Sequence, residues 1–443
     1  MRHETVNEAL QPSGSARRRR RLILHIGDYK SGSTSIQQFL RRNKDLLAEN
    51  GIYFPCEKSA YYMQWGQHVL LATALTGRGV HWLTEESAKL PPLEILTQFR
   101  NDIDKSPADT VVVSSEAFFG LCRAPHLTRQ VMNLFPDFDP TVIVYIRRQD
   151  AHLVSGFQQR CKRGRRHPFN QWKRIIERRS GFYLRRLKSW EKAVGRENVI
   201  VRPFEVEQWK DQNLIADFIH AAGIPEAVDW EIPSRRNEGM GLESVLMLQR
   251  FNRWIWLQGH DPRIWTWQRC RQWVRKHDKF ISKQSLTKIM SPEQRMTYFK
   301  MFEAENSEIA RRYLQRDGSP LFNVLPPSAK NGLESEERTV DTIRRTIELI
   351  RLRNARMQAR LEKRGVDVSA ALALQAPKID PAQASENQLF QLFAFEARKL
   401  FTLKRCRPPR QDARKKPPLN WPKTTLRSLA RRVVRRFADL FGL

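Results

Sequence analysis

Short apolar runs alternate with amphipathic stretches over about residues 21–225. The apolar, β-branched runs predict four strands, at Leu22–Ile26, Thr110–Ser114, Thr141–Ile146 and Asn198–Arg202. Helical periodicity lies between them, at about 34–49, 150–163, 182–194 and 211–222. The central strands are apolar without a break, which indicates burial on both faces and hence parallel pairing. The pattern predicts an α/β fold, a three-layer sandwich with a mainly parallel sheet.

The pattern changes toward both ends of the chain. Residues 1–20 are polar, end in arginines and are expected to form a disordered basic N-terminus. The main α/β domain is expected to span 21–325, and its part from 235 onward is helical and rich in tryptophan and arginine. Those tryptophans suit either a core or a surface that stacks on sugars. Residues 326–443 are predicted to form a helical, strongly basic C-terminal extension.

Two helices are predicted within this extension. Apolar residues recur at spacings of three and four over 340–361, with Asn354 at a core-type position. This seam predicts helix pairing, either in a homodimer or within the same chain. A second helix is expected to begin at Ser385, with Gln388 as its capping-box partner.

The C-terminal end combines apolar and basic positions. Residues 398–443 hold 15 Lys and Arg against two acidic residues, and the apolar residues from Leu426 to Leu440 recur at helical spacing. Such a helix is expected to lie on an anionic membrane surface. Docking on the main α/β domain and binding of nucleic acid are the alternatives.

The whole chain carries a formal net charge of +31, which implies polyanionic partners without identifying them. The five cysteines are scattered and show neither a disulfide pattern nor metal-ligand spacing. No apolar run reaches the ~20 residues of a membrane span, and the run after Arg17–Arg21 is too short for a signal peptide. We expect a cytoplasmic protein, peripheral on the inner face of the membrane if its C-terminal helix binds lipid.

The strongest chemical signal follows the first predicted strand. His25-Ile26-Gly27-Asp28-Tyr29-Lys30 leads into Ser31-Gly32-Ser33-Thr34-Ser35 and then into a helix. A strand, a hydroxyl-rich loop containing glycine and lysine, and a helix N-terminus together make a phosphate-binding loop. It differs from the nucleotide-hydrolase P-loop, because Lys30 precedes Gly32 and the strand at 110–114 ends in Ser114-Ser115-Glu116 instead of a metal-binding Asp. No metal is expected.

The loop resembles the 5′-phosphosulfate-binding loop of sulfotransferases that use 3′-phosphoadenosine-5′-phosphosulfate (PAPS). The family's usual form is K-T-G-T-T. Here Ser replaces Thr at positions 31 and 33, and both positions keep a hydroxyl group. A second family element is an Arg after a strand with a Ser eight positions later, and Arg147 and Ser155 supply it. The resemblance covers about 21–325, the predicted sulfotransferase domain of a bacterial-type, P-loop-like fold. A clear counterpart of the family's Gly-rich third element is missing, and Arg235 and Arg236 are candidates for that side of the site.

The resemblance implies a role for each of these residues. Lys30 and the loop 31–35 would bind the 5′-phosphosulfate, and Lys30 would neutralise the leaving phosphate. Arg147 and Ser155 would bind the 3′-phosphate. Glu116 is the candidate base that deprotonates the acceptor, with His68 as the alternative base and a purely structural role open for both. His25 is expected to be structural.

The acceptor is expected to be a carbohydrate, a glycolipid or another small molecule with a free hydroxyl or amine. The stretch from Arg160 to Lys188 has 12 basic residues and one acidic residue, so it suits an anionic glycan. The rival function is nucleic-acid binding through the same charge, and another phosphonucleotide-dependent transferase is the second alternative. Nucleic-acid binding is the less favoured, because no DNA- or RNA-binding motif is visible and charge alone does not explain the two ordered motifs.

Overall fold

A computed structural model describes residues 19–57, 62–80, 83–179, 183–233, 239–263, 265–282, 284–326 and 336–406. Contacts within the chain form two compact units. The first contains Met1–Gly156, Ile176–Glu238 and Pro292–Ala329, and the second contains Phe157–Ile175, Gly239–Ser291 and Lys330–Leu443. Each unit is described by itself. The domain boundaries expected from the sequence remain predictions.

The first unit is built on a five-stranded sheet whose strands are all parallel. In chain order the strands are β1 (Arg20–His25), β2 (Ile52–Tyr53), β3 (Thr110–Ser114), β4 (Phe138–Ile146) and β5 (Val199–Pro203). Their order across the sheet is β2-β3-β1-β4-β5. The four predicted strands are confirmed, and β2 is an additional edge strand of two residues. His25 lies level with Ser114 on one side, and Ile146 lies level with Pro203, so the carboxyl ends of the strands share one edge.

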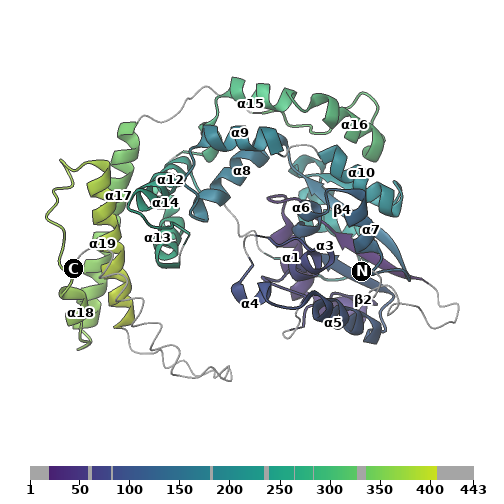
Figure 1. The fold of residues 1–443 in the computed structure, drawn as a ribbon, viewed down its shortest axis with the longest axis horizontal. Helices are drawn as coiled ribbons and strands as arrows, with labels where there is room; N and C mark the ends of the chain where they lie inside the picture. Colours follow the sequence, from purple (N-terminus) through teal and green to yellow (C-terminus); the bar gives the residue numbers. More distant parts are fainter. Residues whose placement is uncertain are drawn as a thin grey trace. The chain divides into compact units, whose positions relative to one another are not determined.

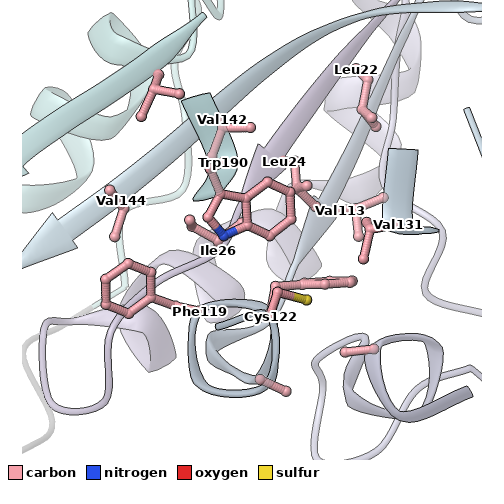
Figure 2. Packing of buried hydrophobic residues seen from close by; sticks show 14 of the residues in the cluster. Leu22, Leu24, Ile26, Val113, Phe119, Cys122, Val131, Val142, Val144 and Trp190 are labelled. Carbon is pink, nitrogen blue, oxygen red and sulfur yellow. The ribbon is translucent and has the colours of Figure 1, made fainter. Parts of the chain in front are cut away.

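Helices cover both faces of this sheet (Figure 1). Strand side chains alternate between the faces: Leu24 and Val113 lie under one helical layer, and Ile23 and Val112 under the other. Figure 2 shows Trp190 among the buried residues of the first layer, together with Leu24 and Val113. The expected three-layer α/β sandwich is confirmed. The first layer contains α3 (Val69–Thr76), α5 (Pro92–Lys105), α6 (Glu116–Leu121), α7 (Pro125–Met132) and α10 (Tyr183–Val194); the second contains α1 (Ser33–Arg42), α2 (Lys44–Glu49) and α11 (Leu214–Ala221).

The predicted helix at 34–49 is divided at Asn43, which separates α1 from α2. The Asn43 side-chain amide donates to the Phe39 carbonyl at 2.9 Å and to the Glu231 carbonyl at 2.9 Å, so the break anchors a distant segment. The remaining helices of this unit are α4 (Glu85–Ala88), α15 (Pro292–Lys300) and α16 (Glu303–Leu314). Helix α8 (Gln149–Lys162) follows β4 and contributes residues to both units, as does α9 (Phe169–Arg179).

The second unit is helical, as expected for the C-terminal part of the chain. It contains α12 (Leu242–Leu257), α13 (Trp265–Lys276), α14 (Asp278–Ile281), α17 (Glu336–Glu362), α18 (Ser369–Leu372) and α19 (Glu386–Arg405). Trp254, Trp267 and Trp273 are buried in it. These tryptophans therefore form core, whereas Trp256 is 47% exposed and lies under the Arg166 guanidinium, 4.1 Å from the ring centre.

The seam at 340–361 pairs α17 with α19 of the same chain. Ile343, Ile347 and Ile350 are buried there, and the Asn354 amide donates to the Glu396 carbonyl at 3.0 Å and to its carboxylate at 2.8 Å. The seam thus packs within one chain, and a homodimer through it stays an untested expectation. The capping box at Ser385 and Gln388 is confirmed. The basic C-terminal helix expected after Pro422 lies outside the described residues.

Candidate active site

The loop after β1 is shaped by residues with positive φ angles. Lys30 (φ 70°) and Gly32 (φ 82°) are both in the left-handed region. Gly32 has no room for a side chain, because a Cβ atom there would lie 2.4 Å from the Leu214 side chain and 2.7 Å from Phe204. Lys30 is a non-glycine residue held in this region, which costs ~1 kcal/mol or more and is typical of functional loops.

Two of the predicted serines hold the loop together. The Ser31 hydroxyl donates to the Asp28 carbonyl at 2.6 Å, and the Ser33 hydroxyl donates to the same carbonyl at 3.4 Å. Both serines are buried, whereas Thr34 is exposed and Ser35 is half-buried. The hydroxyls at 34 and 35 are therefore the more accessible ones to a bound ligand.

Helix α1 begins at Ser33 without a side-chain cap, because its N-cap residue is Gly32. The first N–H groups of a helix carry partial positive charge and need an acceptor. An anion bound in the loop would supply that acceptor, so this helix start fits a phosphate or phosphosulfate group.

Arg147 joins the second predicted motif to the loop. Its Nη1 donates to the Lys30 carbonyl at 3.0 Å, so the Arg after β4 and the Lys after β1 lie close enough to contact one ligand. Phe204, the first residue after β5, lies under the guanidinium at 5.6 Å from the ring centre. Burial lowers the pKa of Arg147, and a buried cation binds an anion more strongly than an exposed one.

An acidic residue inside the loop is paired with a histidine. The buried Asp28 carboxylate lies 2.9 Å from His152 Nδ1 on α8. Burial by itself raises the pKa of Asp28, but the attraction of His152, a hydrogen bond from it and the nearby Arg186 together lower it. Asp28 is thus held as an anion whose carboxylate points at His152.

Tyr183 connects the pair of Asp28 and His152 to Arg147. Its hydroxyl donates to the Arg147 carbonyl at 2.8 Å and lies 3.4 Å from His152 Nδ1. Ser155 lies three residues after His152 on α8, so the two share one face of the helix. Of the two predicted 3′-phosphate residues, Arg147 thus contacts the loop directly, and Ser155 lies on the helix that carries His152.

Glu116 lies at the carboxyl end of β3, next to the loop. Its Oε2 accepts a hydrogen bond from the Gln37 amide of α1 at 3.2 Å. Gly27 has little space beside it, since a Cβ there would lie 3.5 Å from the Glu116 Cβ and 2.5 Å from the Ser33 hydroxyl. The half-buried carboxylate is thus positioned beside the start of the loop that follows β1.

His68 is fully buried, and both of its ring nitrogens are occupied. The Ser114 backbone N–H donates to Nδ1 at 3.1 Å, and Nε2 lies 2.8 Å from the Pro55 carbonyl to which it donates. Burial lowers the pKa of His68 to about 4. A base must reach the acceptor proton, and a histidine saturated by backbone groups cannot do so. Of the two candidate bases, the geometry favours Glu116 and gives His68 a structural role.

His25 is likewise buried on β1, where its Nδ1 lies 2.8 Å from the Ser114 hydroxyl. Burial lowers its pKa to about 3, so the ring is neutral. It ties the ends of β1 and β3 together at the site, in line with the structural role expected of it.

Several positions of the site were not expected from the sequence. Asp28, Tyr183 and Gln37 each contact a predicted residue, and His152 contacts Asp28, yet none was assigned a role from the motifs. Their partners lie on other elements, so spacing along the chain gave no signal for them. Ser234–Glu238, which include the expected Arg235 and Arg236, lie outside the described residues. In the described part of the chain, no three His, Cys, Asp or Glu side chains cluster as metal ligands would.

No family model matches this chain. An uncharacterized protein of the archaeon Archaeoglobus fulgidus is 28% identical over 206 residues, which cover 46% of this chain and 53% of the archaeal protein. The match thus spans about half the length of that curated relative. Among solved structures, a sulfotransferase from Alicyclobacillus acidocaldarius is similar with a TM-score of 0.35 and 16% identity, over 49% of this chain and 87% of that one.

Proposed function

We propose that the protein is a PAPS-dependent sulfotransferase that transfers a sulfuryl group to a hydroxyl or amine, in particular of a carbohydrate or glycolipid. The observation that carries the proposal is the hydrogen bond from Arg147 to the Lys30 carbonyl, 3.0 Å long. It brings together two motifs that are 117 residues apart in the sequence and that resemble the two phosphate-binding elements of one nucleotide site.

The residues of the loop suit the donor. PAPS supplies an activated sulfuryl group on a phosphate leaving group. Lys30, the uncapped helix start at Ser33 and the accessible hydroxyls of Thr34 and Ser35 would bind the 5′ end and stabilise negative charge as the S–O bond to the phosphate breaks. Arg147 would hold the 3′-phosphate through its planar set of donors.

Glu116 would act on the acceptor. Its carboxylate would accept the proton of the acceptor hydroxyl or amine while that oxygen or nitrogen bonds to sulfur. The amide of Gln37 fixes the orientation of the carboxylate, at 3.2 Å from Oε2. One carboxylate oxygen is thereby held, and the other can face the acceptor.

The test is transfer of labelled sulfate from PAPS to a panel of glycans, glycolipids and small alcohols. We expect transfer by the wild-type protein and its loss in Lys30→Ala. Absence of transfer to every acceptor, together with absence of PAPS binding, would contradict the proposal.

A further inference from the structure

A tight turn next to the candidate base carries an exposed tryptophan. Gln64 and Gln67 exchange two backbone hydrogen bonds, of 3.0 and 3.2 Å, around Trp65 and Gly66. Both central residues have positive φ angles, 57° for Trp65 and 80° for Gly66, as the hairpin turns of this length require. Such a turn favours Asn before Gly, and a bulky residue there is strained. The chain thus has a tryptophan where its backbone favours asparagine.

The Trp65 indole buries little of its surface against the rest of the protein. Trp65 is 73% exposed, the highest value among the large apolar side chains that the structure describes. An exposed apolar side chain on a strained backbone stabilises neither the core nor the turn. A ligand contact is the physical reason that fits both features.

The turn is fixed to the elements that hold Glu116. The Ser115 hydroxyl donates to the buried Gln67 side-chain oxygen at 2.9 Å, directly beside Glu116. Gly66 lies against Arg41 of α1, whose guanidinium would be 2.6 Å from a Cβ at that position. Gln37, which binds Glu116, lies one helical turn before Arg41. On α1, the residue that contacts Glu116 and the residue that contacts Gly66 are therefore one helical turn apart, about 5 to 6 Å.

Because of the strand order, this turn and the proposed 3′-phosphate site at Arg147 lie on opposite sides of the central strand β1. The phosphate-binding loop follows the central strand β1, and Arg147 follows β4 on one side of it. Glu116 follows β3 on the other side, and the turn joins that end of β3 because the His68 N–H donates to the Ser114 carbonyl at 3.0 Å. A nucleotide that extends from the loop toward Arg147 leaves the β3 side to the acceptor.

We propose that Trp65 is the stacking platform of a carbohydrate acceptor, with Arg41 beside it to bind the sugar's hydroxyl or acidic groups. This inference rests on the proposed function and names the acceptor class of the same site. The apolar C–H face of a sugar ring packs on the electron-rich face of an indole, and its hydroxyls need polar neighbours. A single open ring among polar side chains suits such a ligand, whereas a small hydrophobic alcohol favours an enclosed apolar cavity.

The experiment is a calorimetric titration with adenosine 3′,5′-bisphosphate (PAP), followed by acceptor probes on the PAP-saturated protein. The probes are chitotetraose, an unsulfated chondroitin oligosaccharide and 2-naphthol. The variants are Trp65→Asn, which removes the ring and suits the backbone, and Trp65→Phe, which keeps an aromatic ring. Trp256→Ala is the matched control, because Trp256 is also exposed (47%) but lies in the other compact unit.

We expect the wild-type protein to bind at least one of the two oligosaccharides. Trp65→Asn should weaken that binding about tenfold or more, keep PAP affinity, and melt at an equal or higher temperature. Trp65→Phe should retain part of the binding, and Trp256→Ala all of it. Oligosaccharide binding that is absent, weaker than that of 2-naphthol, or unchanged in Trp65→Asn would overturn the proposal. A wild-type protein that does not bind PAP would instead contradict the proposed function.

Discussion

Glu116 follows the end of β3, and His68 contacts the last residue of that strand, Ser114, but the surroundings of the two side chains differ. His68 is enclosed by backbone groups, whereas Glu116 has one carboxylate oxygen held by Gln37. We predict that Glu116→Gln lowers kcat by about 10²- to 10⁴-fold, the usual contribution of a general base. PAP affinity should stay near that of the wild type, since in the proposed site the carboxylate would face the acceptor and not the nucleotide. Single-turnover assays with PAPS and calorimetry with PAP measure the two effects.

His68→Gln is the matched variant. It removes the other candidate base and should leave kcat per folded molecule within a few-fold of the wild type. A larger loss of kcat in His68→Gln than in Glu116→Gln would reverse the assignment of the base.

The two buried histidines make stability depend on pH. Burial lowers the pKa of His25 to about 3 and that of His68 to about 4, so the unfolded chain binds protons that the folded chain does not. Their contribution is fully present above pH ~6.5 and is lost as the pH falls toward 4, by about 1.4 kcal/mol per pH unit for each histidine. Urea unfolding at pH 7, 6 and 5 should show this decline. The decline should be shallower in His68→Gln, and equal slopes in the two proteins would contradict the prediction.

From the sequence, candidate site residues could be proposed only where they lie in continuous motifs. Lys30 and Ser31–Ser35 are contiguous, and Arg147 follows a clear strand, so both could be predicted as anion-binding positions. The pairing of Asp28 with His152 could not, because it depends on how α8 lies beside the loop. The strain at Trp65 also became visible only with the backbone φ angle.

At the scale of elements, apolar runs located the buried strands well, because β3 and β4 are apolar and flanked by polar residues. The predicted Thr110–Ser114 strand has the bounds of β3. The edge strand β2 has only two residues and no run to detect. In the first layer, the helix predicted at 182–194 is confirmed as α10, whereas α5 and α7 were not predicted.

The pairing of α17 with α19 gives a prediction on stability. The Asn354 amide donates to the Glu396 carbonyl and carboxylate, and Arg351 donates to the same carboxylate at 2.9 Å. Asn354→Ala should lower the free energy of unfolding by about 1 to 3 kcal/mol, because it leaves a buried carboxylate partly unsatisfied. Thermal denaturation followed by circular dichroism measures the loss.

The control for that variant is Arg356→Ala, at an exposed position of the same helix. An exposed side chain contributes little to stability, so this variant should melt within about a degree or two of the wild type. Equal melting temperatures for Asn354→Ala and Arg356→Ala would show that the buried amide contributes no stability.

At the scale of the whole molecule, the charge of +31 predicts weak, non-specific binding of duplex DNA at low salt. That binding should fall steeply between about 50 and 200 mM salt, by about 10³-fold or more if six or more phosphates are contacted. In the proposed site PAP would make only a few local contacts, so its binding should persist in this range. Filter binding of DNA with and without PAP tests whether the two ligands act independently. Sequence-specific, salt-resistant DNA binding would favour the rival function.

The net charge of the chain does not identify the ligand. The two compact units differ in that only the first holds the candidate site. Among the described residues, no helix has both the length and the apolar character to cross a lipid bilayer. The candidate site lies entirely in the first unit, at the shared edge of the parallel strands, where ligands bind in sheets of this kind.

The central claim is that Lys30 and Arg147 bind the two ends of one 3′-phosphorylated nucleotide. The direct measurement is calorimetric titration with PAP and with adenosine 5′-phosphate, which lacks the 3′-phosphate. We expect PAP to bind about 10- to 100-fold more tightly, with no need for Mg²⁺. Arg147→Ala should abolish that preference, whereas Arg148→Ala should keep it because the Arg148 guanidinium is held by Asp150. Equal affinity for the two nucleotides in the wild-type protein, or a preference that survives in Arg147→Ala, would contradict the account.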